Sequence, residues 1–529
     1  MRNAVRSLVL LLAVGCIIPS AFAAELRVTG FIDNVFPRWD SNLSSVDQDT
    51  TRKEEIFMGR TRLRNFFNFI ANDNLRGVFA IEIDQSYGAP SSNRLGSGCV
   101  EEDGAYGFEQ CGFDNGIDNN AIEIKQVYVD FRVPQLPIGN RWRIGGLPFN
   151  LTPLHSPTLY TMDAGGGDVW FDFSDQVSLM LYYVQLEEDL DRFRGSTKLG
   201  EDYITGGTLM LKPLPGLDFH ILGVYNHGQN PFGPALTGGG GPFNNIAQDF
   251  TNVTTESRYY LGFDSRYRFG NTSIEPGFLY LLGSRNFCTP GTLVNTLGTR
   301  IPCTSPAGSP GSTDFNAFQG FVVVQHTTGP WLFGAKFAYA SGDSAKNDIN
   351  NRGIGSRSDV KGFRFLGVDT SHFFGEWFEL LGKSDVDGNG QRSFRRMGEA
   401  GHLDRFGWMD IGGKAEYQYT ENLVLVGAAG GFWTADKTGC PARFRLNTTP
   451  ETCRGPGSPL NSSGQPAFNF TGNSNFVGWE VNAGVRYTIM PGLSWTPLVA
   501  YADYGKALDA NNRKAMDAWA VVNRVIYIF

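Results

Sequence analysis

The chain repeats one pattern from end to end, a segment of about ten residues in which apolar and polar side chains alternate. The clearest segment runs from Arg76 to Asp84, where Phe79, Ile81 and Ile83 share one face. Such alternation is typical of a β-strand whose two faces meet different environments. After residue 23 no apolar run approaches the ~18 residues that a membrane-spanning helix needs. The pattern predicts a large all-β protein and excludes a helical membrane protein.

Two kinds of connection alternate between these segments. Tight turns such as Asn72-Asp73-Asn74 are followed by polar loops of about 20 to 60 residues, which soluble domains rarely carry. A closed sheet pairs every backbone N–H and C=O inside hydrocarbon, and outer-membrane barrels have tight turns at one rim and long loops at the other. We therefore predict a transmembrane antiparallel β-barrel of about 18 strands, with 16 as the alternative. The expected strands are 25–36, 55–70, 75–84, 121–133, 141–147, 169–173, 177–187, 202–212, 217–225, 257–269, 273–283, 314–326, 331–342, 406–420, 423–433, 476–489, 493–505 and 515–529.

Residues 1–23 have the composition of a cleaved secretion signal. Two arginines precede an apolar core from Leu8 to Ile18, and Ala21-Phe22-Ala23 forms an A-x-A cleavage site. Cys16 raises the alternative of a lipoprotein, which the continuing apolar core disfavours. We assign residues 24–529 to the barrel as one domain. Cleavage removes both arginines and takes the formal charge from −8 to −10, which disfavours a nucleic-acid partner.

The remaining cysteines form three pairs that are local in sequence, with members 12, 15 and 13 residues apart. Each pair falls in a stretch rich in Gly, Pro, Asn or Asp between two expected strands. Exported proteins meet an oxidising compartment, so an even, clustered set indicates disulfides rather than free thiols. We expect the local pairing among the connectivities that six cysteines allow. The six are Cys99, Cys111, Cys288, Cys303, Cys440 and Cys453.

The chain ends on a patterned strand. Alternate residues back from Phe529 are Tyr527, Val525, Asn523, Val521 and Trp519, and Asn523 departs from the otherwise apolar set. This end resembles the signature of Gram-negative outer-membrane barrels. The resemblance implies that barrel-assembly machinery recognises the chain through Phe529.

The whole of residues 24–529 resembles the large porins, which have 16 or 18 strands and an in-folded third loop. A likeness to the alginate-export-type and substrate-specific porins rests on the segment Arg60 to Arg64, the turn at Asn72 and the sequence Gly145-Gly146-Leu147-Pro148-Phe149. The resemblance implies location in the outer membrane, contact with lipid and lipopolysaccharide, and a choice between monomer and homotrimer.

Charged side chains on the strands must face the lumen, because Arg on the lipid face costs about 2–4 kcal/mol at the midplane. On strand 121–133 the charges change parity at Lys125, which predicts a β-bulge there. Rings of charge are how pores select ions, although these charges can also merely solvate the wall. The expected pore-lining residues are Arg60, Arg62, Arg64, Glu82, Asp84, Arg141, Arg143, Arg258, Arg266 and Arg268.

The third long loop, residues 148–168, is the expected constriction. It carries His155, Tyr160, Asp163 and Asp168 around three consecutive glycines. We hypothesise that the two aspartates face the arginines across an eyelet and so orient polar solutes. The alternative is a surface loop outside the lumen.

A half-motif for calcium lies in the seventh long loop. Asp385, Asp387 and Asn389 stand at positions one, three and five of a D-x-D-x-N-G sequence. Position twelve is Arg396, where a calcium loop has a bidentate Glu. An ordinary Asp/Gly-rich turn is therefore the favoured interpretation, and a site for structural Ca²⁺ is the alternative. We expect no other cofactor.

The predicted function is passive diffusion of ions and small polar solutes through a water-filled barrel. An enzyme is disfavoured because no G-x-S-x-G or H-E-x-x-H motif occurs. A plugged receptor needs about 22 strands and an N-terminal plug. A polymer-export channel is compatible with the same barrel and is the main alternative, and an adhesin is another.

Overall fold

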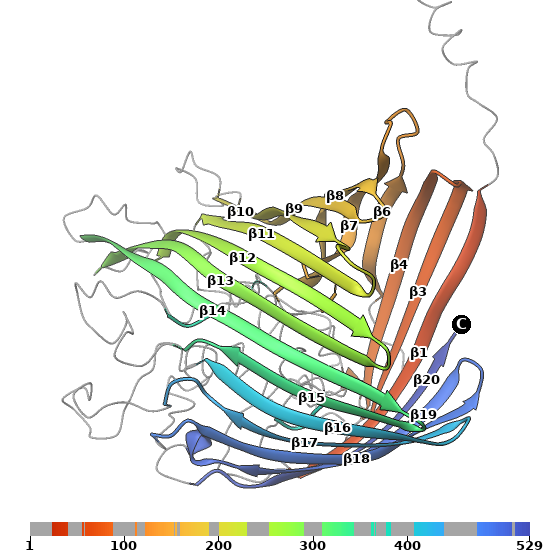
Figure 1. Ribbon diagram of the computed structural model, residues 1–529, viewed down its shortest axis with the longest axis vertical. Coiled ribbons are helices and arrows are strands. Elements are labelled where there is room, and N and C mark those ends of the chain that lie inside the picture. The colour runs from red at the N-terminus through yellow and green to blue at the C-terminus, as the bar shows by residue number, and fades with distance from the viewer. Residues whose placement is uncertain are drawn as a thin grey trace, which may run out of the picture.

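The chain forms one long curved sheet, seen in the computed structural model of Figure 1. The structure describes residues 24–40, 55–57, 59–87, 112–113, 122–152, 154–155, 159–189, 200–229, 253–289, 309–342, 361–363, 366, 377–381, 407–437, 473–509 and 514–529.

Within these residues there are 18 strands of nine or more residues and two short ones, β2 (Glu55–Phe57) and β5 (Gly112–Phe113). The long strands are β1 (Glu25–Asp40), β3 (Gly59–Asn72), β4 (Leu75–Tyr87), β6 (Glu123–Phe131), β7 (Gly139–Asn150), β8 (Thr161–Ser174), β9 (Val177–Asp189), β10 (Gly200–Leu211), β11 (Leu217–Gln229), β12 (Val253–Phe269), β13 (Thr272–Thr289), β14 (Ser309–Thr328), β15 (Trp331–Ala340), β16 (Trp408–Thr420), β17 (Leu423–Trp433), β18 (Phe476–Met490), β19 (Leu493–Tyr504) and β20 (Ala518–Ile528). A short 3₁₀ helix, η4 (Lys506–Leu508), follows β19.

The sheet closes on itself through its first strand. β1 pairs antiparallel with β3 on one side and with β20 on the other, so that Ile32 lies opposite both Leu63 and Tyr527. Each long strand also pairs antiparallel with its neighbour along the chain. The prediction of an all-β antiparallel barrel with 18 strands is therefore confirmed.

The C-terminal residue completes this closure. The Phe529 N–H donates to the Gly30 carbonyl at 3.0 Å, and the Gly30 N–H donates to the Phe529 carbonyl at 2.9 Å. Tyr527 and Phe529 are about two-fifths exposed, on the outward side of β20. The last residue is thus held in the sheet next to the first strand.

Alternation gives the wall two different faces. On β12, Tyr259 and Leu261 are half exposed on the outside, whereas Arg258 and Tyr260 on the inside are fully buried. The same order holds on β18, where Val481 is exposed and Glu480 is buried. Within the described residues, no helix is both long and apolar enough to cross a bilayer.

The predicted β-bulge at Lys125 is confirmed. Ala80 of β4 lies opposite Gln126, but the next residue, Ile81, lies opposite Ile124. Lys125 is therefore the extra residue of β6. Its insertion moves the charges on either side of it onto the same face of the sheet.

Several predicted features fall outside the described residues. They include the signal segment 1–23, the calcium half-motif at Asp385, Asp387 and Asn389, and all cysteines except Cys288. The backbone of Cys288 belongs to β13, opposite Pro310 of β14. The disulfides and the calcium site stay predictions.

Candidate functional site

One buried carboxylate organises the cations on the inner wall of β3, β4 and β6. Glu82 forms an ion pair with Arg64, its partner in register on β3. The Lys125 Nζ lies 3.4 Å from Glu82 and the Arg62 Nε lies 3.8 Å from it. Three cations therefore lie around the Glu82 carboxylate, and Asp84 lies opposite Arg62 in register. Arg60 and Asp84 lie on the same strands, β3 and β4.

A second shared carboxylate lies nearer the tight turns. Asp130 of β6 accepts hydrogen bonds from the Arg76 Nε at 2.7 Å and from the Arg141 Nε at 2.9 Å. Arg143 on β7 pairs with Asp168 of β8. Ion pairs on β3, β4, β6, β7 and β8 join Arg62, Arg64, Arg76, Lys125, Arg141 and Arg143 to Glu82, Asp130, Asp163 and Asp168.

The expected eyelet of Asp163 and Asp168 opposing the arginines is wrong. Both residues belong to β8, which begins at Thr161, so neither lies in a loop. Asp168 binds Arg143 on the adjacent strand, and Asp163 binds Lys125 at 2.9 Å. Asp168 therefore neutralises a neighbouring cation in the wall, and Asp163, in the part of β8 that no longer pairs with β9, meets Lys125 of β6 and not an arginine. The run of three glycines suggested a loop, but the chain continues as a strand there.

The other predicted arginines have different surroundings. The Arg258 side chain is fully buried against Glu256 and the Phe315 ring, so it cannot line a water-filled path. Arg266 donates to the Leu154 carbonyl at 3.0 Å. Arg268 is more than half exposed and lies 3.7 Å from Asp218. Arg258 is therefore a structural residue of the wall.

The end of the β7–β8 hairpin, residues 147–164, leaves the wall and turns into the barrel. We call this segment the inward hairpin. Pairing of β7 with β6 stops at Gly146, and pairing of β8 with β9 stops at Gly165, although β7 and β8 stay paired with each other. Beyond the bend, apolar side chains are almost completely buried: Leu147, Phe149, Leu151, Leu159 and Tyr160.

Two facing glycines make the bend. Gly145 and Gly166 lie opposite each other, with φ of +135° and +155°. A Cβ on Gly145 would lie 2.4 Å from the Val127 carbonyl oxygen, and one on Gly166 would lie 2.1 Å from that of Tyr183. Only glycine accepts both the backbone angle and the close approach. The sequence around these positions thus sets where the hairpin departs from the wall.

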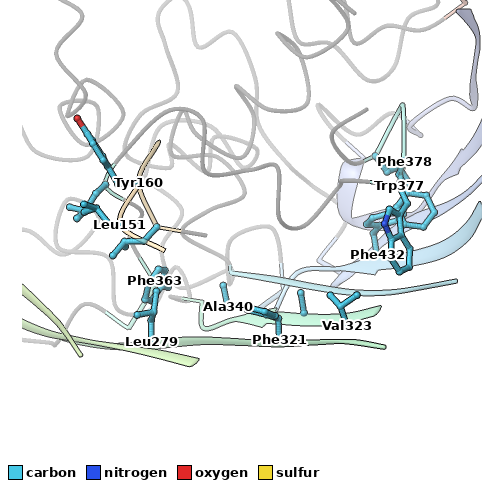
Figure 2. Close-up of a cluster of buried hydrophobic side chains, with 14 of the residues drawn as sticks. Leu151, Tyr160, Leu279, Phe321, Val323, Ala340, Phe363, Trp377, Phe378 and Phe432 are labelled. Carbon is cyan, nitrogen blue, oxygen red and sulfur yellow. The ribbon is translucent and has the colours of Figure 1, made fainter. Parts of the chain in front are cut away.

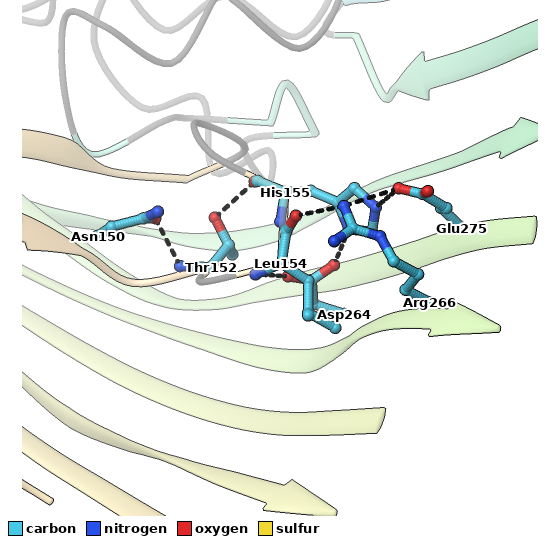
Figure 3. Close-up of polar contacts among 7 residues, drawn as sticks. All are labelled: Asn150, Thr152, Leu154, His155, Asp264, Arg266 and Glu275. Carbon is cyan, nitrogen blue, oxygen red and sulfur yellow. Dashed lines mark hydrogen bonds and ion pairs between the residues drawn. The ribbon is translucent and has the colours of Figure 1, made fainter. Parts of the chain in front are cut away.

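The inward hairpin reaches β12 and β13 on another part of the inner wall (Figure 3). Asp264 accepts the backbone N–H of Leu154 at 3.1 Å and of His155 at 3.2 Å. The His155 ring bonds to Asp264 through Nδ1 and to Glu275 through Nε2, the latter at 2.6 Å. Arg266 bridges the Leu154 carbonyl and Glu275, each at 3.0 Å. His155 and Tyr160 therefore lie inside the barrel, which excludes the alternative of an outside loop for them.

A second connection also folds against the inner wall, and the sequence analysis did not anticipate it. This is the β15–β16 connection, which contains residues 377–381. Glu480 of β18 accepts the backbone N–H groups of Glu379, Leu380 and Leu381 at 2.6, 3.0 and 2.5 Å. Residues 377–381 are buried there, and Trp377 and Phe378 pack near Phe432 of β17 (Figure 2). Their signal was a group of large apolar residues in an otherwise polar loop.

The two inward segments touch each other. The Leu366 N–H donates to the Leu159 carbonyl at 3.1 Å, and the Phe363 N–H donates to the Ser341 carbonyl at 2.9 Å. The Phe363 ring packs edge-on against Tyr260 at 5.8 Å. Apolar side chains of both segments therefore pack against the inner wall between β12 and β18, beside the ion pairs of β12 and β13.

Comparisons with known proteins concern the fold. No protein-family model and no curated protein matches the chain. Solved structures similar to it include OccK1 (OpdK) and the outer membrane protein OprD, both of Pseudomonas aeruginosa, and OccAB4 of Acinetobacter baumannii. Their identities are 10%, 10% and 9%, and their TM-scores 0.45, 0.44 and 0.43. Each match covers 96% of this chain, and 98%, 95% and 99% of the other.

Proposed function

We propose that this protein is a porin of the Gram-negative outer membrane, through which ions and small polar solutes diffuse passively. One observation carries the proposal: a closed barrel with a largely apolar outer face and a ladder of ion pairs inside. Water is the natural medium for the inner face and hydrocarbon for the outer one.

The outer face supports the membrane location. Large apolar side chains are exposed on successive strands around the barrel, among them Leu181, Ile221, Leu261, Phe278, Phe318, Phe337, Ile411 and Val499. Soluble proteins rarely expose a contiguous apolar patch of more than a few hundred Å². In a bilayer the same surface is satisfied by lipid, and lipopolysaccharide and lipid are its proposed partners.

The inner face supports diffusion of charged solutes. The wall of β3 to β8 carries charges of both signs, and we expect its arginines to contribute to the choice between anions and cations. The inward hairpin leaves this wall at β7 and β8 and narrows the path. No covalent step and no cofactor is needed for such transport.

Reconstitution into planar bilayers tests the proposal directly. Purified protein should give discrete conductance steps, and liposomes carrying it should swell in small sugars and carboxylates. The control is the same detergent without protein. Failure of folded, detergent-solubilised protein to produce steps would refute the function as a porin.

The charged wall gives a specific prediction for ion preference. In the double variant Arg62→Ala, Arg64→Ala, Glu82 keeps only Lys125 among its three cations. We expect the reversal potential in a salt gradient to shift toward cations. Arg27→Ala removes a charge at an exposed pair with Glu25 and should leave the potential unchanged. An identical anion-to-cation ratio in the double variant would exclude these arginines from selectivity.

A further inference from the structure

We propose that His155 is a positioning residue: as an imidazolium bound between two carboxylates, it holds the inward hairpin against the opposite wall and so sets the aperture of the channel. The proposal rests on the proposed function as a porin. It goes beyond that function by identifying one ionisable side chain, that of His155, as a link between the constriction and the barrel wall.

The His155 ring has a carboxylate at each of its two nitrogens. Both ring nitrogens of His155 lie against carboxylate oxygens, Nδ1 against Asp264 and Nε2 against Glu275. A neutral imidazole has one N–H, so one nitrogen would turn its lone pair toward a carboxylate. Only the doubly protonated ring donates at both positions. The geometry therefore selects the cation.

The charges around the ring also favour the imidazolium. Two carboxylates, Asp264 and Glu275, face two cations, the His155 ring and Arg266. Along β11, His220 lies opposite Asp264 in register. From β14 the uncharged Phe321 ring lies 5.1 Å from the imidazole and edge-on to it. Loss of the imidazolium charge would leave this group of residues with an excess negative charge.

The ring lies at the far end of a bent hairpin. The hairpin leaves the wall at Gly145 and Gly166, and beyond this bend its strands pair only with each other. At its tip, the bonds from Leu154 and His155 to β12 and β13 are the polar ties to the opposite wall that Figure 3 shows. The His155 ring adds two bonds to carboxylates to that attachment.

Ionisation of the ring then gives the attachment a pH dependence. Burial lowers the pKa of His155, but hydrogen bonds with Asp264 and Glu275 outweigh burial and raise it from 6.5 to about 9. A raised pKa means that the stabilisation is complete below pH 6.5 and is lost as the pH rises through about 9. At neutral pH the hairpin is held in place.

Single-channel recording of His155→Ala is the main test. At pH 7 we expect a larger conductance step and a reversal potential shifted toward cations, because the hairpin tip is released and two carboxylates face Arg266 alone. Wild-type channels should change in the same direction as the pH rises through about 9, and the variant should lack this transition. His326→Ala, at an exposed position where the ring contacts Thr272, is the matched control and should behave as wild type.

A second measurement does not depend on conduction. In protein labelled at its six histidines, NMR should show the His155 ring protonated up to about pH 9, with the signal assigned by its loss in His155→Ala. In Glu275→Gln, which keeps the side-chain shape, the midpoint of the His155 titration should fall toward pH 6.5.

The outcomes separate the two proposals. A wild-type channel that conducts, with His155→Ala identical in step size and selectivity, would overturn the role of His155 and leave the porin standing. Absence of conductance in both proteins would overturn the porin and with it any effect on a channel aperture. A His155 ring that titrates near pH 6.5 would overturn the imidazolium link in either case.

Discussion

Replacement of Asp410 by alanine should lower the free energy of unfolding by about 3–5 kcal/mol, because it breaks a buried ion pair with a lysine. The Lys336 Nζ lies 3.1 Å from an Asp410 carboxylate oxygen, and both side chains are completely inaccessible to solvent. The Trp377 ring, 5.6 Å from the Lys336 nitrogen, covers the pair. Water cannot take the place of the lost carboxylate beside Lys336 unless residues 377–381 move away.

Urea titration of the barrel in lipid vesicles measures this effect. The double variant Lys336→Met, Asp410→Leu removes both charges with similar volumes and should recover most of the lost stability. A surface control is Glu25, whose ion pair with Arg27 is exposed, so that Glu25→Ala should change little. Equal stability of Asp410→Ala and the wild type would contradict the prediction, as would a double variant no more stable than the single one.

The sequence predicted the strands well because lipid imposes a strict rule on them. Where a strand crosses hydrocarbon, every second side chain must be apolar, and this alternation is visible without any knowledge of neighbours. Beyond the bilayer the rule no longer applies, although pairing continues. For this reason β13 extends to Thr289 and β14 begins at Ser309, whereas the sequence placed these boundaries at 283 and 314.

The constriction was predicted less accurately because its cause is local backbone geometry. Gly165, Gly166 and Gly167 suggested a loop, but in the structure they lie in β8 and allow a paired hairpin to bend. The prediction that His155 and Tyr160 belong to the third loop was correct, whereas Asp163 and Asp168 were assigned to the wrong element. Two carboxylates bond to the His155 ring. They belong to Asp264 and Glu275, which lie more than 100 residues from His155 in the sequence. No local pattern reveals such a pairing.

Docking of residues 377–381 also depends on distant partners. Glu480 has the spacing of any inward-facing charge on β18, and only the fold shows that it accepts backbone N–H groups from another segment. The apolar residues of that segment, Trp377, Phe378, Leu380 and Leu381, were the available signal. Such a group of apolar residues in a loop indicates a segment that packs against another part of the protein.

Replacement of Glu480 by alanine is expected to release this segment from the wall. The variant leaves three N–H groups without an acceptor, and each costs roughly 1–3 kcal/mol if it stays buried. Undocking of residues 377–381 lets water satisfy them but gives up the burial of Phe378 and Leu381. Either response lowers the free energy of unfolding by roughly several kcal/mol.

Undocking and strain can be told apart by two measurements on the same variant. If the segment leaves the wall, limited proteolysis should cut near Trp377 and the single-channel conductance should rise. If it stays, stability falls while both readouts match the wild type. Glu480→Gln retains one carbonyl oxygen of the same shape and should lie between the two, and Glu416→Ala, which removes a partly exposed carboxylate bound to Arg486, controls for lost charge. Unchanged stability in Glu480→Ala would show that these three hydrogen bonds do not hold the segment, and packing of its apolar residues would then be the dominant force.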